Sequence, residues 1–235
     1  MIRVASYNIR KSVGLDRQRR PDRIVEILNE INADVIALQE VDRRIGARET
    51  TIPREMIEQE TDLKVVEIAT RPDSIGWHGN AILVRKSADV HNNRRHDVPV
   101  LEPRGAISAD IEIHGEHLRV VGMHLGLLRN FRRQQIRAVT GQMEQLDAKM
   151  PTLIMGDLNE WRPEGSLSEF GEDYAIATPG PSFHSSRPVA SLDRIILRND
   201  LDLLNGAVHH SDLSRMASDH LPIYADIKVS ARVAI

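Results

Sequence analysis

The sequence predicts an α/β protein in which two mixed β-sheets pack against each other and helices cover their outer faces. Predicted strands outnumber predicted helices, and several strands follow one another through short turns. This pattern disfavours a purely doubly wound sheet, in which a helix connects each strand to the next. The length of 235 residues suits one domain over residues 1–235, and a chain of this size can bury a large core without disulfides.

The first half of the chain alternates apolar segments with turn residues. Residues 2–9 are β-like, and Pro21 opens a predicted helix with apolar residues on one face. Residues 34–38 read as a buried strand, and Pro53 begins a second helix that runs through Glu60. Further strands are predicted at residues 64–69, 80–85, 105–113 and 118–124, with a hairpin turn at 114–116.

The second half begins with the longest predicted helix, over residues 130–149, whose apolar side chains recur at helical spacing. Pro151 ends that helix, and residues 152–155 form the next strand. Late strands are predicted at residues 192–197, 201–208 and 221–229.

Composition and charge exclude several kinds of function. The chain has no cysteine, so disulfides, thiolate metal sites and a cysteine nucleophile are excluded. The net charge of −3 and an aromatic content of 3% are unlike those of a dedicated DNA-binding protein. The N-terminus lacks the apolar core of a signal peptide, and no apolar run reaches transmembrane length, so the expected location is cytoplasmic. No obligate protein partner is evident.

Several predicted strands end in the same way, with an apolar run followed by a side chain that can bind a metal or carry a proton. One such ending means little, because Asp and Asn often cap turns and helices. A set of them on rigid strand ends is typical of an active site. These residues are Asn8, Glu40, His124, Asp157, Asn159, Asp193, Asp219 and His220.

The chemistry of this set favours a hard cation with proton transfer beside it. Carboxylate and amide oxygens are the ligands that Mg²⁺ and Mn²⁺ prefer. The two histidines are suited to proton transfer or phosphate contact. Phosphoryl transfer requires charge neutralisation and a positioned nucleophile more than a covalent partner, so the set matches that reaction.

These motifs resemble the endonuclease/exonuclease/phosphatase superfamily. The resemblance rests on segments that occur in family order over residues 6–223, and GDLN with a downstream SDH is the most specific pair. The segments are SYNIR, LQEVD, GNAILVR, RGA, GMHLG, GDLNEW, SLDRI and SDHLPI. The resemblance implies a four-layer α/β/β/α sandwich with its site at one edge of the two sheets, and one or two Mg²⁺ or Mn²⁺ ions.

The resemblance also implies roles for single residues. Asn8 and Glu40 would bind the metal, and Asp219 would bind it or lie close to it. Asp157 would polarise or deprotonate the attacking water, and Asn159 would orient that water and the phosphate.

The remaining implied roles concern the two histidines and the substrate. Asp193 would hold His220 in the correct tautomer, while His220 and His124 would contact phosphoryl oxygens or assist the leaving group. The predicted substrate-binding residues are Arg10, Asn80 and Arg104. Arg104 is also compatible with pairing to a structural carboxylate.

Three positions depart from particular branches of the superfamily. Arg10 stands where AP endonucleases resemble one another in carrying an acid, and His124 stands where they carry a tyrosine. Asp42 replaces a basic residue of the deoxyribonuclease branch. An abasic-site repair role is therefore disfavoured, and minor-groove binding in the deoxyribonuclease style is in doubt.

Other polar features of the sequence are compatible with plain structural roles. A solvated helix face is favoured for Arg129, Arg132, Arg133 and Arg137, and the loop with Arg17, Arg19 and Arg20 is balanced between surface and phosphate contact. His209 and His210 are adjacent on a strand, so they point to opposite faces and do not share one ion. Trp161 either stacks on a substrate group or closes the end of the core.

The function predicted from these observations is a divalent-metal-dependent phosphodiesterase, similar to a nuclease. Its substrate would be a phosphoester from a nucleic acid, a nucleotide or a phospholipid headgroup. A phosphomonoesterase on the same site is an alternative, because a few loop residues can supply a tenfold preference. A non-catalytic binding protein on the same fold is the alternative of another class.

Overall fold

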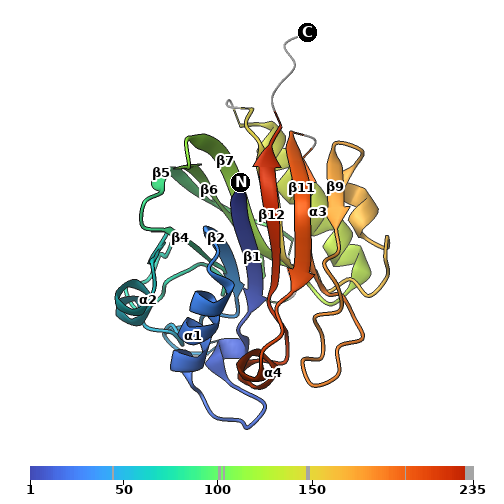
Figure 1. Ribbon diagram of the computed structural model, residues 1–235. Coiled ribbons are helices and arrows are strands. Elements are labelled where there is room, and N and C mark those ends of the chain that lie inside the picture. Colours follow the sequence, from blue (N-terminus) through green and yellow to red (C-terminus); the bar gives the residue numbers. More distant parts are fainter. Residues whose placement is uncertain (44, 100–101, 103, 147–148, 199, 231–235) are drawn as a thin grey trace.

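The computed structural model describes residues 1–235 except 44, 100–101, 103, 147–148, 199 and 231–235. Two six-stranded sheets pack face to face, and helices cover the outer face of each (Figure 1). The layers follow the order α/β/β/α, so the predicted fold class is confirmed. In the described part of the chain, no helix is both long enough and apolar enough to span a membrane.

The first sheet has the strand order β11-β12-β1-β2-β4-β3. Its strands are β1 (Ile2–Asn8), β2 (Val35–Gln39), β3 (Leu63–Val65), β4 (Ala81–Arg85), β11 (Leu201–Val208) and β12 (Ile223–Val229). Helices α1 (Pro21–Ile31), α2 (Arg54–Glu60) and α4 (Asp212–Ala217) lie on its outer side. Ile24, Ile27 and Leu28 of α1 pack in one cluster with Ile36 and Leu38 of β2, as the helical spacing predicts.

The second sheet has the strand order β5-β6-β7-β8-β10-β9. Its strands are β5 (Asp89–His96), β6 (Gly105–Ile113), β7 (Glu116–His124), β8 (Thr152–Asp157), β9 (Tyr174–Ala177) and β10 (Asp193–Arg198). Helix α3 (Arg129–Glu144) and the short 3₁₀ helix η2 (Leu167–Phe170) cover its outer face. A second 3₁₀ turn, η1 (Arg10–Ser12), follows β1 directly.

Strand direction explains why the polar strand ends meet. Each sheet contains one parallel pair near its centre, β1 with β2 and β7 with β8. The carboxyl ends of these four strands lie at one edge of the sandwich. Strands β4, β6, β10 and β12 run antiparallel to them and begin at the same edge. Residues far apart in sequence therefore converge there.

Strand alternation then decides which side chains face one another. Val4, Val120, Leu153 and Ile195 belong to the apolar core between the sheets. Side chains two residues apart in a strand share a face. Along this inner face, the last residue of β1, β7 and β8 and the first residue of β10 are polar. They are Asn8, His124, Asp157 and Asp193. The site thus begins where the apolar core between the sheets ends.

Several elements differ from the sequence-based expectations. The strand predicted at 64–69 is the shorter β3, which begins one residue earlier, at Leu63, and ends at Val65. Helix α3 ends at Glu144, and residues 147–148 of its predicted extension lie outside the described part. Strands β5 and β9 and helix α4 were not predicted. Strand β5 (DVHNNRRH) is a mostly exposed edge strand without apolar alternation, and α4 has only six residues.

Candidate active site

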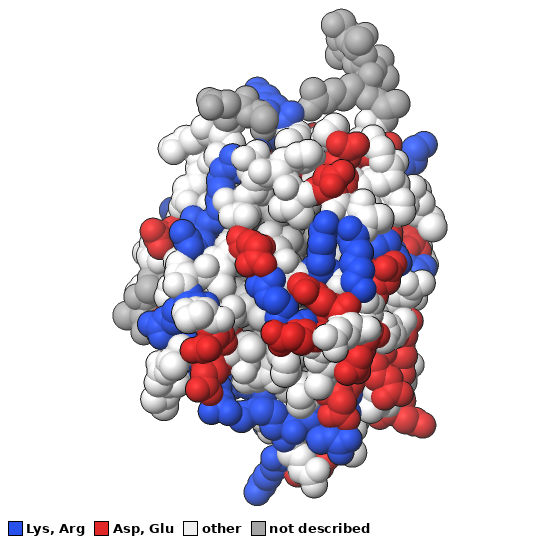
Figure 2. Space-filling view, turned by 90° about the vertical axis from the view of Figure 1, so that its left-hand side faces the viewer, with Lys and Arg blue, Asp and Glu red and all other residues white. Residues whose placement is uncertain are grey.

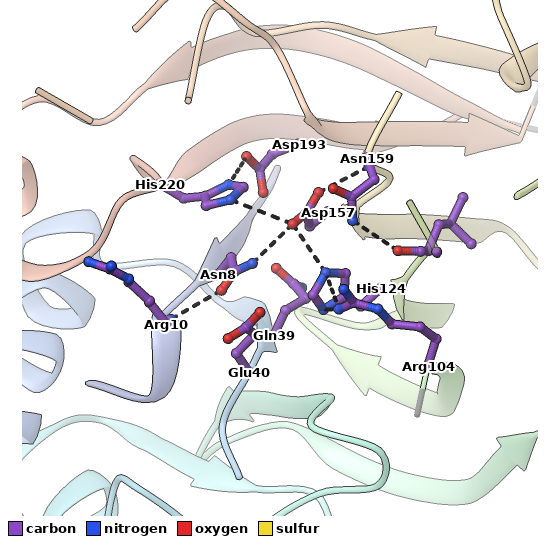
Figure 3. Close-up of polar contacts among 12 residues, drawn as sticks. Asn8, Arg10, Gln39, Glu40, Arg104, His124, Asp157, Asn159, Asp193 and His220 are labelled. Atoms are coloured by element: carbon purple, nitrogen blue, oxygen red, sulfur yellow. Dashed lines mark hydrogen bonds and ion pairs between the residues drawn. The ribbon is translucent and has the colours of Figure 1, made fainter. Parts of the chain in front are cut away.

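An open cavity of about 320 Å³ lies at the edge where the polar strand ends converge (Figure 3). Nine of the eleven predicted site residues line it. They are Asn8, Arg10, Glu40, Arg104, His124, Asp157, Asn159, Asp219 and His220. Asp193 lies directly behind His220, and Asn80 lies away from the cavity. The structure thus brings together ten of the eleven residues in one cluster.

Asp157 is the buried centre of the cluster. Its Oδ2 accepts a hydrogen bond from Asn8 Nδ2 at 3.0 Å and lies 3.2 Å from His124 Nε2 and 3.6 Å from His220 Nε2. Its Oδ1 accepts the backbone N–H of Asn159 at 3.0 Å. Burial alone would raise the pKa of Asp157, but the two histidines and Asn8 outweigh burial and lower the pKa. The carboxylate therefore stays ionised and is a weak base in this arrangement.

His220 is held between two acids. Its Nδ1 lies 2.9 Å from Asp193 Oδ2. The same oxygen accepts a hydrogen bond from the Ser182 hydroxyl at 2.5 Å. Burial would lower the pKa of His220, but the charges of Asp193 and Asp157 prevail and raise the pKa to about 10. The imidazole is thus positively charged at neutral pH, with Nδ1–H directed at Asp193. This is the orienting arrangement of carboxylate and histidine found in hydrolase triads.

The second histidine of the cavity is fixed by a guanidinium. Arg104 Nη1 lies 2.6 Å from Nδ1 and 2.5 Å from Nε2 of His124, and Arg104 Nη2 pairs with Glu102 at 3.3 Å. Arginine only donates and an ionised carboxylate only accepts. The His124 ring therefore lies between a donor, Arg104 Nη1, and an acceptor, Asp157 Oδ2. Arg104 lines the cavity and also pairs with a carboxylate, and its role in substrate binding stays a prediction.

The three predicted metal ligands face the cavity from the first sheet and the segment before β12. Two cations of η1 pair with the two carboxylates: Lys11 Nζ forms an ion pair with Glu40, and Arg10 Nε lies 3.4 Å from Asp219 Oδ2. The Asn8 side-chain oxygen accepts the backbone N–H of Arg10 at 3.1 Å. Two carboxylates and one amide oxygen beside an open cavity are a donor set that fits a hard divalent ion.

The two asparagines of the prediction have different surroundings. Asn159 Nδ2 donates to the Leu125 carbonyl at 2.9 Å, which leaves its side-chain oxygen for the cavity. Asn80 is fully buried, and its Nδ2 donates to the Gly105 carbonyl at 3.1 Å. Asn80 thus joins the start of β4 to the start of β6. Its substrate role stays a prediction, and its position fits an indirect contribution through the packing of the two sheets.

The glycine of the GDLN segment, Gly156, occupies a position that has no room for a side chain. A Cβ on Gly156 would lie 1.8 Å from the Met123 carbonyl oxygen, and the backbone there has a φ of 159°. Strands β7 and β8 approach closely at this point, where His124 pairs in register with Asp157. A side chain at position 156 would separate the two strands that carry these residues.

Some residues of the site were missed at the sequence level. Lys11 and Glu102 line the cavity, and Phe183 lies beside His220 with ring centroids 5.0 Å apart. Trp161 packs edge-on against Phe183 at 6.0 Å and is 64% exposed, so it forms an outer wall and does not close the core. The sequence signal for Lys11 was its place next to Arg10, just after Ile9, whereas no local pattern indicated Phe183.

The basic helix face has mainly structural roles. Arg132 is buried and pairs with Glu160 at 3.1 Å, while Arg133 and Arg137 each lie 2.5 Å from Glu169. The arginines of the loop after η1, for which surface and phosphate contact were equally expected, do not line the cavity. They are Arg17, Arg19 and Arg20, and Arg19 donates a hydrogen bond to the Lys11 carbonyl at 3.2 Å. His209 pairs with Glu30 at 2.6 Å. None of these residues adds a cation to the cavity itself.

Comparisons with known proteins agree with this geometry. The model of the endonuclease/exonuclease/phosphatase family matches residues 5–220. The Escherichia coli protein YbhP is 28% identical, with 96% of this chain and 95% of YbhP covered.

Two solved structures show the same fold at low sequence identity. Danio rerio TDP2, solved with a single-strand DNA product, has a TM-score of 0.75 at 19% identity over 97% of this chain and 99% of that chain. A Bacteroides thetaiotaomicron mannosyl-6-phosphatase has a TM-score of 0.76 at 17% identity over 97% of this chain and 100% of its own. The family match over most of the chain, together with the fold, establishes that this chain belongs to the endonuclease/exonuclease/phosphatase family.

Proposed function

We propose that the protein is a divalent-metal-dependent phosphodiesterase. The observation that carries this proposal is the division of the cavity into two sides. Glu40, Asp219 and Asn8 offer oxygen ligands on one side, and the His220–Asp193 pair faces them beside Asp157. Charge neutralisation and a positioned nucleophile are the two requirements of phosphoryl transfer.

The protein side chains divide the work of the reaction as follows. Asp157 has a lowered pKa, so it would orient the attacking water as a hydrogen-bond acceptor. Asn159 offers its side-chain oxygen to the same water. The His220 cation and Arg104, which is buried beside His124, stabilise the negative charge that develops on the phosphoryl oxygens.

The cavity carboxylates would hold Mg²⁺ or Mn²⁺ together with Asn8. A bound ion supplies charge stabilisation at a phosphoryl oxygen. Lys11 and Arg10 must then leave their carboxylates or share them with the ion, because each occupies a carboxylate in the structure. The released ammonium and guanidinium would be placed at the cavity wall, where they can contact a substrate phosphate.

The surroundings of His220 favour a substrate with a planar group next to the phosphate. Phe183 lies beside His220, and Trp161 packs edge-on against Phe183. A continuous basic surface is not seen on the face that carries α2 and β5, where Lys and Arg alternate with Asp and Glu (Figure 2). The aromatic rings beside His220 support a nucleotide or a short nucleic-acid end as the substrate.

Hydrolysis of a phosphodiester panel tests the function. We expect turnover of bis-aryl and dinucleotide diesters with Mg²⁺ or Mn²⁺, loss of turnover with chelator, and recovery when the ion is restored. Asp157→Ala should remove most activity, by about 10³-fold or more. Faster turnover of the matched aryl monoester would favour the phosphomonoesterase. Full activity of Asp157→Ala, or turnover that chelator leaves intact, would refute the proposed mechanism.

Substitution of Lys11 tests the competition between its ammonium and the divalent ion. We expect Lys11→Met to raise the affinity for Mg²⁺ by about tenfold, because the ion no longer has to displace a cation from Glu40. Calorimetric titration with Mg²⁺ measures this without any substrate. Arg17→Met is the matched control, since this exposed residue of the same loop lies outside the cavity lining. An unchanged or weaker affinity of Lys11→Met would contradict the competition.

A further inference from the structure

We propose a second metal site, for Zn²⁺ or a similar transition-metal ion, on the outer face of the second sheet. It is formed by His91, Glu112 and His117, which come from β5, β6 and β7. One possible ligand atom from each residue lies within 4.8 Å of the others. Two imidazoles and a carboxylate form the set of three protein ligands typical of zinc sites that keep an open position.

The two imidazoles converge on one carboxylate oxygen. His91 Nε2 and His117 Nε2 each lie 3.8 Å from Glu112 Oε2. Ligand atoms around a tetrahedral ion at bonds of about 2.0–2.1 Å lie roughly 3.4 Å apart. Small side-chain rotations therefore complete the geometry, and all three side chains have room to rotate because they are 49%, 41% and 62% exposed.

The backbone explains why three strands supply one cluster. Glu112 pairs in register with His117 across the β6–β7 hairpin, so the two side chains stand next to each other on one face. The β5–β6 register shifts between Val90 and Asn92, and His91 is the extra residue at this bulge. A bulge redirects a side chain out of the regular strand pattern. It places His91 within reach of Glu112.

The neighbouring charges leave the cluster available to a cation. Arg119 lies opposite Asp110 in the next row along the sheet, and Arg94 lies one row further; both pair with Asp110, at 2.6 Å and 3.1 Å. Asp110 therefore offsets one of these two positive charges beside the cluster. His117 and His124 are at opposite ends of β7, seven residues apart, which corresponds to roughly 23 Å along a strand. The cluster is thus separate from the catalytic cavity.

The donor set distinguishes this cluster from the cavity. Imidazole nitrogens suit Zn²⁺, Ni²⁺ and Cu²⁺, whereas oxygen donors suit Mg²⁺. The two sites should therefore select different ions. A bound ion would also connect the edge strand β5 to β6 and β7, and so stabilise the folded state against unfolding.

Calorimetric titration of the full chain with Zn²⁺ tests the site. Because the cavity can also take up Zn²⁺, the titration is made in a Glu40→Gln background as well as in the wild type. We expect one Zn²⁺ to remain in that background, and its affinity to fall at least tenfold in His91→Ala and in His117→Ala. Glu112→Gln should weaken it as well. The matched control is His210→Ala, an exposed histidine outside the cluster, which should leave the affinity unchanged.

Two further measurements separate the cluster from a general surface effect. Cu²⁺ bound in the Glu40→Gln background should show nitrogen hyperfine coupling from two imidazoles, reduced to one in either His→Ala variant. Zn²⁺ should raise the Tm of the wild type and not that of the His91→Ala/His117→Ala double variant, which should keep the wild-type circular dichroism. A Zn²⁺ isotherm that is the same in the double variant and its parent would overturn the site.

Discussion

Replacing Asp193 with asparagine is expected to lower kcat by about 10³-fold with little change in KM. Asn has the shape of Asp, so the fold should persist. It has no charge to hold the His220 cation, and its amide can donate to Nδ1 where Asp193 only accepts. The imidazole then loses the orientation that directs Nε2 toward Asp157 and the cavity. Steady-state kinetics on a phosphodiester with Mg²⁺ measures the change.

The control for this variant is Ser182→Ala. Ser182 Oγ donates to the same Asp193 oxygen at 2.5 Å, but it does not contact His220. Ser182→Ala should therefore cost stability with a much smaller effect on kcat. If Asp193→Asn keeps the wild-type kcat, or if both variants lose the same activity, the orienting role of Asp193 is wrong.

Replacing Glu160 with glutamine is expected to destabilise the fold by roughly 3 kcal/mol near neutral pH. Glu160 is buried, and its carboxylate accepts the Ser166 N–H and hydroxyl at 2.7 and 2.6 Å and Arg132 Nη2 at 3.1 Å. Gly165 is required beside it, since a Cβ there would lie 2.3 Å from the Glu160 carboxyl carbon. Glutamine would leave the buried Arg132 guanidinium without its counter-charge. Urea denaturation measures the loss.

The stability difference should depend on pH in a defined window. Burial would raise the pKa of Glu160, but the bonds from Ser166, Arg162 and Arg132 outweigh burial and lower the pKa from 4.5 to about 2. A carboxyl group with a lowered folded-state pKa stabilises the fold above its unfolded pKa, and this contribution is lost as the pH falls. The difference in free energy of unfolding between the wild type and Glu160→Gln should thus be fully present above pH 4.5 and should disappear as the pH falls toward about 2.

Glu169→Gln is the matched control, because Glu169, like Glu160, forms ion pairs with arginines of α3. Those arginines, Arg133 and Arg137, have side chains that are 44% and 61% exposed. Exposed ion pairs contribute about 0–1 kcal/mol, so this variant should be nearly as stable as the wild type. Equal losses in Glu160→Gln and Glu169→Gln would contradict the assignment of the larger effect to the buried pair.

The sequence predicted the layers and most of the candidate site because both depend on local patterns. Apolar runs that end in Asn8, His124 and Asp157 place these side chains on strand ends, and the parallel central pairs bring the ends together. The motif resemblance added the order of the segments and the implied roles of single residues. The family and the fold class are confirmed, and the roles of single residues stay predictions.

What the sequence did not predict depends on contacts between distant segments. Strand β5 is held by backbone pairing at a sheet edge, so its side chains carry no apolar alternation. Arg132 has the same sequence context as Arg133, and only the fold shows that it is buried against Glu160. Asn80 belongs to a matching motif, yet its side chain bonds to the backbone between the sheets.

The convergence of the two sheets makes the proposed active site a joint property of both halves of the chain. Asn8 and Glu40 come from β1 and the end of β2 in the first sheet, while His124, Asp157 and Asp193 come from the second, and the apolar core lies between the sheets. The Asn8–Asp157 hydrogen bond crosses this boundary. Turnover is therefore expected to depend sensitively on how the two sheets pack against each other. Conservative exchanges such as Ile107→Val, remote from any reacting atom, can alter kcat while every catalytic side chain is kept.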